Sequence, residues 1–156
     1  MNIRKAELKD TTYILNLIQE LAKFERQPEA VIITEEDLVR YSFSEHPLIY
    51  TWVAEIDSEI VGIALYYFRF STWKGRSLHL EDLIVKENHR QKGIGRALIN
   101  KVIEIAHTEN VGRMEWEVLE WNQPAIDFYH SLGATIDPEW SLCKLYREDL
   151  VKLVSI

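Results

Sequence analysis

A strand, a turn with two glycines and an amphipathic helix follow one another in the middle of this chain, and this succession most constrains its fold. Residues 77–85 are rich in apolar side chains and predict the strand. Residues 95–108 place apolar side chains at helical spacing and predict a helix with one buried face. Gly93 and Gly95 let the backbone approach a ligand closely. Because the first N–H groups of a helix are unpaired and lie at the positive end of its dipole, we predict that this turn binds phosphate.

Three cations, Arg90, Lys92 and Arg96, surround the turn. They would add charge-assisted hydrogen bonds to a pyrophosphate or a 3′-phosphate. The turn has neither the Gly-Lys-Ser/Thr ending of a Walker loop nor the Gly-x-Gly-x-x-Gly fingerprint of a Rossmann fold, which disfavours nucleoside triphosphates and NAD. The alternative is a solvated basic loop in front of an ordinary helix.

The remaining pattern predicts one domain over residues 1–156, of mixed α/β class, with a mixed sheet and helices on both faces. Asp10 or Thr11 would cap the first helix, and Pro28 would end it. The other predicted helices lie at 34–42, 95–108 and 123–132, the last stopped by Gly133. The predicted strands lie at 1–8, 48–56, 59–70, 77–85, 113–119 and 142–147.

Composition narrows the class of partner. The 156 residues carry a formal net charge of −7, which argues against nucleic acid and fits a cationic partner, although an acidic surface can serve solubility alone. The first ten residues lack the apolar run of a signal peptide, and we expect no membrane helix because no stretch approaches roughly 20 apolar residues. We therefore predict a soluble, cytoplasmic protein.

Cys143 is the only cysteine, so no intrachain disulfide can form, which favours a reducing compartment. It lies between Leu142 and Leu145 in a predicted strand, where a buried, inert thiol is expected. The alternative is an acetyl-cysteine intermediate. The five histidines show no spacing typical of metal ligands, and we predict no metal site. They are His46, His79, His89, His107 and His130.

The motif Arg90-Gln91-x-Gly93-x-Gly95 resembles the acetyl-CoA motif of the GCN5-related N-acetyltransferase (GNAT) superfamily. Leu80-Glu81-Asp82 and Trp121-Asn122-Gln123-Pro124-Ala125-Ile126-Asp127-Phe128-Tyr129 are similar to its diamine (spermidine/spermine) branch. The similarity covers roughly positions 3 to 150. The resemblance implies the GNAT fold, a homodimer, and direct transfer of acetyl from acetyl-CoA to a primary amine in a ternary complex.

The resemblance also implies roles for individual residues. Those expected to bind acetyl-CoA are Leu83, Ile84, Val85, Arg90, Gln91, Lys92, Gly93, Ile94, Gly95, Arg96, Asn122, Gln123, Pro124, Ala125 and Tyr129. Those expected to contact a small cationic amine are Phe24, Glu25, Glu81, Glu115, Trp116 and Glu117. The chain departs from the branch at Phe24, where a tyrosine is usual, and in the shorter segment 135–140.

Two residues are candidates for proton transfer. A primary amine is protonated at neutral pH, and Glu81, just before the cofactor strand, is the best candidate to deprotonate it. Strict alternation would place Glu81 and Leu83 on one face of the strand and Asp82 on the other. Tyr129, by the resemblance, would protonate the leaving thiolate. The alternatives are an ordinary surface carboxylate at 81 and a core aromatic at 129.

Two other functions stay open. One is acetylation of a protein N-terminus or lysine, against which the acidic strand Glu115-Trp116-Glu117 argues mildly. The other is a non-catalytic acyl-CoA-binding module.

Overall fold

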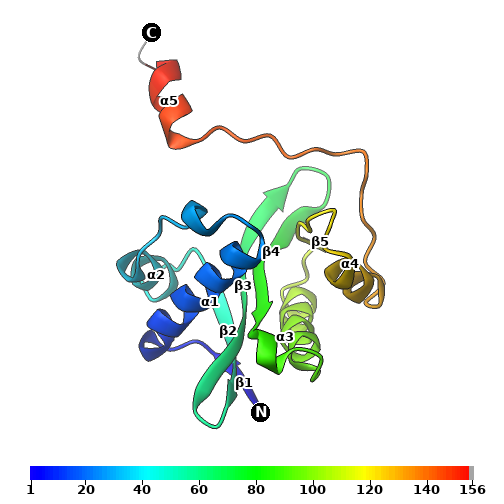
Figure 1. Ribbon diagram of the computed structural model, residues 1–156. Coiled ribbons are helices and arrows are strands. Elements are labelled where there is room, and N and C mark those ends of the chain that lie inside the picture. The colour runs from blue at the N-terminus through cyan, green and yellow to red at the C-terminus, as the bar shows by residue number, and fades with distance from the viewer. Residues whose placement is uncertain (155–156) are drawn as a thin grey trace. The chain divides into compact units, whose positions relative to one another are not determined.

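The computed structural model describes residues 1–154 as parts of two compact units, 1–117 and 118–154, which are treated separately (Figure 1). In the first unit, five strands form one sheet in the order β1-β2-β3-β4-β5. Neighbours from β1 to β4 are antiparallel, and β5 is parallel to β4, which confirms the predicted mixed sheet. The strands are β1 (Asn2–Lys5), β2 (Tyr50–Ile56), β3 (Glu59–Ser71), β4 (Gly75–Val85) and β5 (Arg113–Glu115).

Three helices in this unit cover the two faces of the sheet (Figure 1). They are α1 (Thr11–Phe24), α2 (Glu35–Ser42) and α3 (Ile94–Thr108). The core on the α1 and α2 side is built from aliphatic side chains of both helices and of three strands, since a sheet face must be buried against another layer. Its buried members are Ile14, Leu17, Leu38, Val53, Ile60, Ile63 and Ile84. On α3, the predicted apolar stripe is confirmed by the full burial of Leu98 and Val102.

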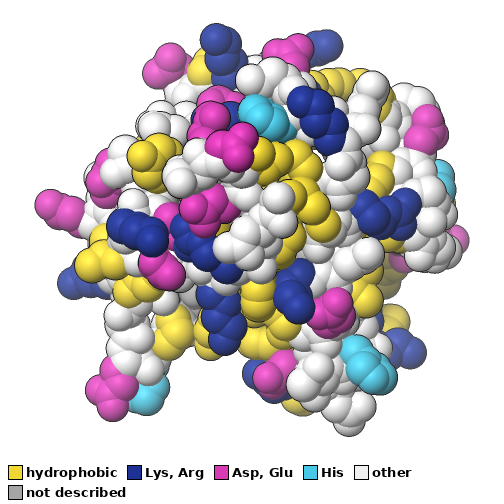
Figure 2. Space-filling model, turned by 90° about the horizontal axis from the view of Figure 1, so that it is seen from below, with side chains coloured by type: hydrophobic (Ala, Val, Ile, Leu, Met, Phe, Trp, Pro, Cys, Tyr) yellow, Lys and Arg dark blue, Asp and Glu magenta, His cyan; other side chains and the backbone are white. Residues whose placement is uncertain are grey.

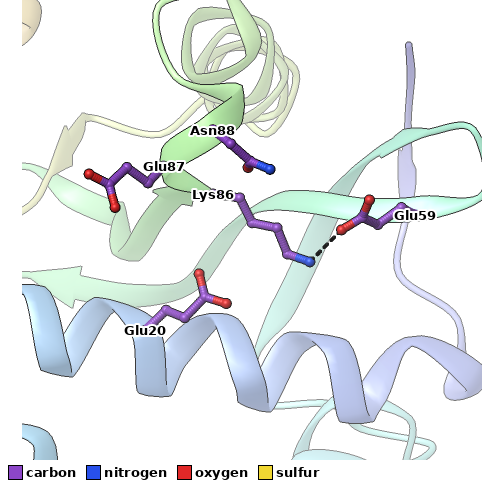
Figure 3. A pocket seen from close by; sticks show the side chains of 5 residues that line it. All are labelled: Glu20, Glu59, Lys86, Glu87 and Asn88. Atoms are coloured by element: carbon purple, nitrogen blue, oxygen red, sulfur yellow. Dashed lines mark hydrogen bonds and ion pairs between the residues drawn. The ribbon is translucent and has the colours of Figure 1, made fainter.

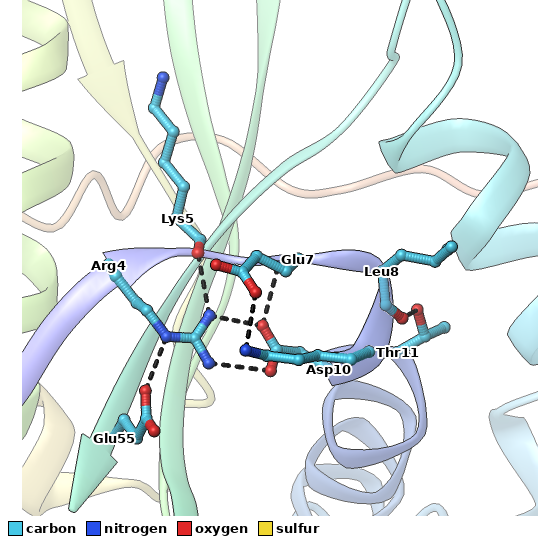
Figure 4. Close-up of polar contacts among 8 residues, drawn as sticks. Arg4, Lys5, Glu7, Leu8, Asp10, Thr11 and Glu55 are labelled. Carbon is cyan, nitrogen blue, oxygen red and sulfur yellow. Dashed lines mark hydrogen bonds and ion pairs between the residues drawn. The ribbon is translucent and has the colours of Figure 1, made fainter. Parts of the chain in front are cut away.

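An ion-paired cluster fixes the first strand to the start of the first helix (Figure 4). Arg4 donates hydrogen bonds of 2.6 and 2.9 Å to the two carboxylate oxygens of Asp10, and one of 2.7 Å to Glu55 on β2. Burial alone would raise the pKa of Asp10, but the hydrogen bonds from Arg4 and from the Glu7 N–H lower it. This buried carboxylate is therefore a structural anion rather than a candidate base.

The second unit contains α4 (Gln123–His130) and α5 (Arg147–Val154). The strand predicted at 142–147 is wrong: residues 141–146 form neither helix nor strand, and α5 begins at Arg147. A strand requires a neighbour for its N–H and C=O groups, and the described part of this unit contains no other strand. The expectation that Cys143 is buried is wrong for the same reason, because its side chain is exposed.

Between residues 1 and 154, no helix is long and apolar enough to cross a membrane. Figure 2 shows Lys and Arg side chains interspersed with Asp and Glu on the side of the molecule seen from below.

Candidate functional site

The predicted phosphate turn connects β4 to α3. Gly93 is the N-cap of α3 and has φ 79° and ψ 0°, a left-handed conformation that glycine adopts without steric cost. Having no side chain, Gly93 cannot cap the first N–H groups of α3, so they remain available to an anion. A Cβ added at Gly93 would meet no heavy atom within 4 Å, so the space over this turn is open. The geometry fits a phosphate group.

Two of the predicted cations form hydrogen bonds with backbone carbonyls beside this turn. The Nε of Arg90 donates 2.9 Å to the carbonyl of Val85, at the end of β4. The Nζ of Lys92 donates 2.9 Å to the carbonyl of Asn88. The guanidinium of Arg90 also lies 5.1 Å from the centre of the Phe24 ring, at the C-terminal end of α1. The contacts hold the charges of both residues close to the turn.

Strands β4 and β5 pair over a short length. Among the described residues, the pairing joins Ser77, Leu78 and His79 of β4 to Arg113, Met114 and Glu115 of β5. The later residues of β4, including Leu83, Ile84 and Val85, pair with β3 on their other side. The β5-facing edge of this second half of β4 can therefore offer backbone hydrogen bonds to a ligand.

A β-bulge interrupts β4 at Glu81. Leu80 pairs with Tyr66 and Asp82 pairs with Leu65, so Glu81 is an extra residue opposite the Leu65–Tyr66 step of β3. The carboxylate of Glu81 lies 3.5 Å from the imidazole of His79. Asp82 pairs with Leu65 and His79 pairs with Tyr67, and Leu65 and Tyr67 share a face of β3, so Asp82 lies on the same side of the sheet as His79. Glu81 contacts His79 and therefore projects to this side as well. The expectation that Asp82 points away from Glu81 is wrong, because the bulge breaks strict alternation.

Three carboxylates therefore gather beside the end of α1. Burial, together with the charges of Glu81 and Glu25, raises the pKa of Asp82 to about 7. A raised pKa follows when a carboxylate is both desolvated and close to others of like charge. A cluster of this kind attracts cations and includes one carboxyl that titrates near neutral pH. Reasoning from the sequence gave Asp82 no role, although it lies within the Leu-Glu-Asp motif.

The aromatic side chain of Tyr67 borders this cluster. Burial, the negative charge of Glu81 and a hydrogen bond to Glu81 raise the pKa of the Tyr67 hydroxyl. The charge of Glu117 acts on the hydroxyl in the same direction. The negative charges of Glu81 and Glu117 thus both act on the Tyr67 hydroxyl.

Glu115, one of the predicted amine ligands, is held by two arginine side chains. Its carboxylate forms ion pairs with Arg69 and with Arg113, the latter at 2.7 Å. These two guanidiniums compensate its charge. We therefore place the anionic centre of the site at Glu25, Glu81 and Asp82 rather than at Glu115.

In the second unit, the predicted helix is confirmed around α4. The side chain of Asn122 accepts a hydrogen bond of 3.4 Å from the Ala125 N–H and so caps this helix, and Pro124 occupies its first turn. The Gln123 amide donates 2.7 Å to Asp127 one turn later. Tyr129 lies in the last turn of α4, with its ring 5.4 Å from that of Phe128.

An open pocket in the first unit is lined by none of the predicted site residues (Figure 3). It is lined by Glu20, Glu59, Lys86, Glu87 and Asn88, and Lys86 donates 2.6 Å to Glu59 across it. In the part of the chain covered by the structure, no group of three or more His, Cys, Asp or Glu residues is placed to hold a metal ion.

Comparison with known proteins identifies the family. Residues 12–134 match the Acetyltransferase (GNAT) family. The chain belongs to this family. The GNAT match includes β4, the Gly93 turn, α3 and α4, the elements that carry most of the predicted site.

Relatives of this GNAT chain include a thialysine N-epsilon-acetyltransferase from Bos taurus, 44% identical over 140 residues that cover 85% of this chain and 82% of the relative. A spermidine/spermine N(1)-acetyltransferase-like protein 1 from Homo sapiens is 36% identical over 97% of this chain and 23% of its own length. These relatives place the chain in the diamine acetyltransferase-like branch, and it is an N-acetyltransferase.

Solved structures agree on the fold. An integron cassette protein from the mobile metagenome of V. cholerae superposes with a TM-score of 0.80 at 28% identity, covering 99% of this GNAT chain and 98% of the other. An aminoglycoside acetyltransferase from an uncultured soil sample has a TM-score of 0.75 at 21% identity, covering 93% and 94%, and shows the shared fold alone.

Proposed function

We propose that this enzyme transfers the acetyl group of acetyl-CoA to a primary amine of a small cationic substrate, either lysine-like or a polyamine. The observation that carries the proposal is the cluster of Glu25, Glu81 and Asp82 at the bulge of β4. Carboxylates at this position would hold an ammonium group and accept its proton. The names of the relatives, a thialysine and a spermidine/spermine-like acetyltransferase, support the same class of acceptor.

Acetyl-CoA is the expected donor because GNAT acetyltransferases use it. Its phosphates would bind the N–H groups at the start of α3, with Arg90, Lys92 and Arg96 adding positive charge. The β5-facing edge of Leu83, Ile84 and Val85 would offer backbone groups to the acetyl and pantetheine portion. Asn122, Gln123, Pro124 and Ala125 are expected along the rest of the CoA arm.

In the proposed reaction, the free amine attacks the thioester directly. A new N–C bond forms at the acetyl carbon, the C–S bond breaks, and the electron pair leaves with sulfur. Glu81 takes the proton of the ammonium, which at neutral pH costs about 4.6 kcal/mol to remove from an amine of pKa about 10.4. Tyr129 donates its hydroxyl proton to the departing thiolate, and the second proton, which the nitrogen loses as the amide forms, returns to the Tyr129 phenolate. Direct transfer requires both substrates to be bound together.

The family match spans 12–134 and thus crosses the boundary between the two units, which supports our expectation of one catalytic domain over residues 1–156. The resemblance to the diamine branch further suggests a homodimer. The single cysteine favours a reducing, cytoplasmic location. Light scattering of the purified protein tests the dimer.

The experiment that tests the function is an acetyl-CoA consumption assay with a panel of acceptors at fixed concentration. The panel contains thialysine, lysine, spermidine, short diamines and peptides with free N-termini or lysines. We expect turnover with small amines and little with peptides. Turnover confined to peptides would support a protein acetyltransferase instead. Binding of CoA without turnover of any amine would indicate an acyl-CoA-binding module.

A further inference from the structure

His79 is a buried histidine beside the proposed base. Its side chain lies on β4, between Tyr67 of β3 and Glu115 of β5, and the residue is 8% exposed. The imidazole and the Tyr67 ring are 5.0 Å apart, centre to centre, at an angle of 33°. Two neighbouring strands and a ring contact therefore fix the position of the imidazole.

The two ring nitrogens of His79 have different surroundings. Nε2 lies 3.5 Å from a carboxylate oxygen of Glu81. Nδ1 is buried and has no hydrogen-bond partner among the described residues. A neutral imidazole carries one N–H, and a buried N–H without an acceptor costs about 1–3 kcal/mol. The tautomer with the proton on Nε2, facing Glu81, is therefore the favoured one.

Other anions do not compete for this N–H. The cross-strand neighbour Glu115 is already in ion pairs with Arg69 and Arg113. Asp82 and Glu25 contribute charge to the cluster, but the carboxylate that contacts His79 is that of Glu81. Tyr67, on the adjacent strand, hydrogen-bonds the same carboxylate. Glu81 is thus contacted by a phenol and an imidazole that contact each other.

We propose that His79 is a positioning residue, whose Nε2–H holds the Glu81 carboxylate in the orientation that receives the proton of the amine. The inference rests on the proposed function of Glu81. A bulged residue has less backbone support than a regular strand residue, because it has no partner in the ladder. Side-chain donors must then supply the orientation that the ladder does not. The 3.5 Å separation is expected to shorten when the amine binds, as is common for catalytic hydrogen bonds.

Three substitutions at His79, to glutamine, asparagine and phenylalanine, separate the role of the Nε2 donor from that of the ring. The amide nitrogen of glutamine reaches roughly the position of Nε2, whereas that of asparagine reaches the position of Nδ1. His79→Phe keeps a ring against Tyr67 but has no donor. We expect His79→Asn and His79→Phe to lower kcat about tenfold or more, with KM for acetyl-CoA unchanged, and His79→Gln to stay within about threefold of wild type. His107→Asn, on the exposed end of α3, is the matched control.

Equal losses in all three variants would overturn the proposal, because they would indicate a packing role. Thermal unfolding checks that each variant is folded. A second test uses the wild-type protein, in which long-range ¹H–¹⁵N spectra report the tautomer of His79. We expect Nε2–H in the neutral ring. Nδ1–H would overturn the proposal.

A double-mutant cycle with Glu81→Gln separates this inference from the function it rests on. If His79 acts through Glu81, His79→Asn has little further effect on kcat in the Glu81→Gln background. A second outcome is that Glu81→Gln lowers kcat while His79→Asn lowers kcat by the same factor in that background as in wild type. This result would reject the positioning role of His79 and leave the proposed role of Glu81 intact. If Glu81→Gln itself leaves kcat unchanged, the proposed base fails, and the inference fails with it.

Discussion

Glu81 and Asp82 are adjacent in the sequence, yet their side chains lie on the same side of β4. The bulge opposite Leu65 and Tyr66 is responsible, because it inserts Glu81 into the strand without a partner. A regular strand would have directed one of the two carboxylates to the opposite face of the sheet. The bulge therefore concentrates negative charge at the proposed amine site.

Glu81→Gln should depress the rate most at neutral pH and least near pH 9 to 10. Glutamine keeps the shape of the side chain but cannot accept the proton, and the amine increasingly arrives unprotonated as the pH approaches its own pKa of about 10.4. The measurement is the ratio of variant to wild-type kcat/KM across this range. Glu104→Gln, on the exposed side of α3, is the control. A ratio that stays flat with pH would remove Glu81 as the base.

Asp82→Asn should stabilise the folded protein above pH 7 and leave it unchanged near pH 4. The pKa of Asp82 is raised from 3.8 to about 7, so the folded state binds the extra proton between these values. Wild-type stability therefore falls as the pH rises from about 4 to about 7, by up to about 4 kcal/mol, and asparagine removes this loss. Urea unfolding of both proteins at pH 4, 6 and 8 measures the difference in their free energies of unfolding. A difference independent of pH would contradict the assignment.

The local elements that carry the proposed site could be predicted from the sequence, and the structure confirms these elements. The strand, the Gly93 turn and α3 depend on neighbouring residues, and Gly93 adopts the left-handed conformation for which glycine is suited. The cap of α4 by Asn122 is likewise local. Such features can be read from spacing and residue type alone.

What could not be predicted depends on partners distant in the sequence. The bulge at Glu81 is a property of the register between β3 and β4, which alternation in one strand does not reveal. The neutralisation of Glu115 requires Arg69 from another strand. The predicted strand at 142–147 had the right pattern, but residues 118–154 contain no strand that could pair with it. Its alternating pattern was not sufficient without a neighbour.

Gly95→Asp should weaken acetyl-CoA binding at least tenfold, equivalent to about 1.4 kcal/mol. The substitution places a carboxylate among the phosphates at the start of α3. The fold should be kept, because a Cβ at this position would meet Val85 at an ordinary 3.8 Å. Calorimetric titration with CoA measures the affinity, and Gly95→Asn separates charge from bulk. Equal affinities for the aspartate variant and wild type would exclude the phosphate turn.

Tyr129→Phe should lower kcat by roughly 100-fold and change KM for acetyl-CoA little. A phenol that donates a proton only as the thiolate leaves contributes in the transition state and not in binding. Steady-state kinetics measure both constants. Tyr146→Phe, an exposed tyrosine of the same unit, is the control and should behave as wild type. Normal turnover in Tyr129→Phe would assign this side chain to packing.

In the proposed function, the carboxylates of Glu25, Glu81 and Asp82 select a small amine with more than one positive charge. Comparing kcat/KM for a diamine and for a monoamine of the same length, at low and at high salt, tests it most directly. We predict that the diamine is the better acceptor and that its advantage shrinks as ionic strength rises, because salt screens the attraction between the second ammonium and the carboxylates. An equal or greater kcat/KM for the monoamine at low salt would contradict the account.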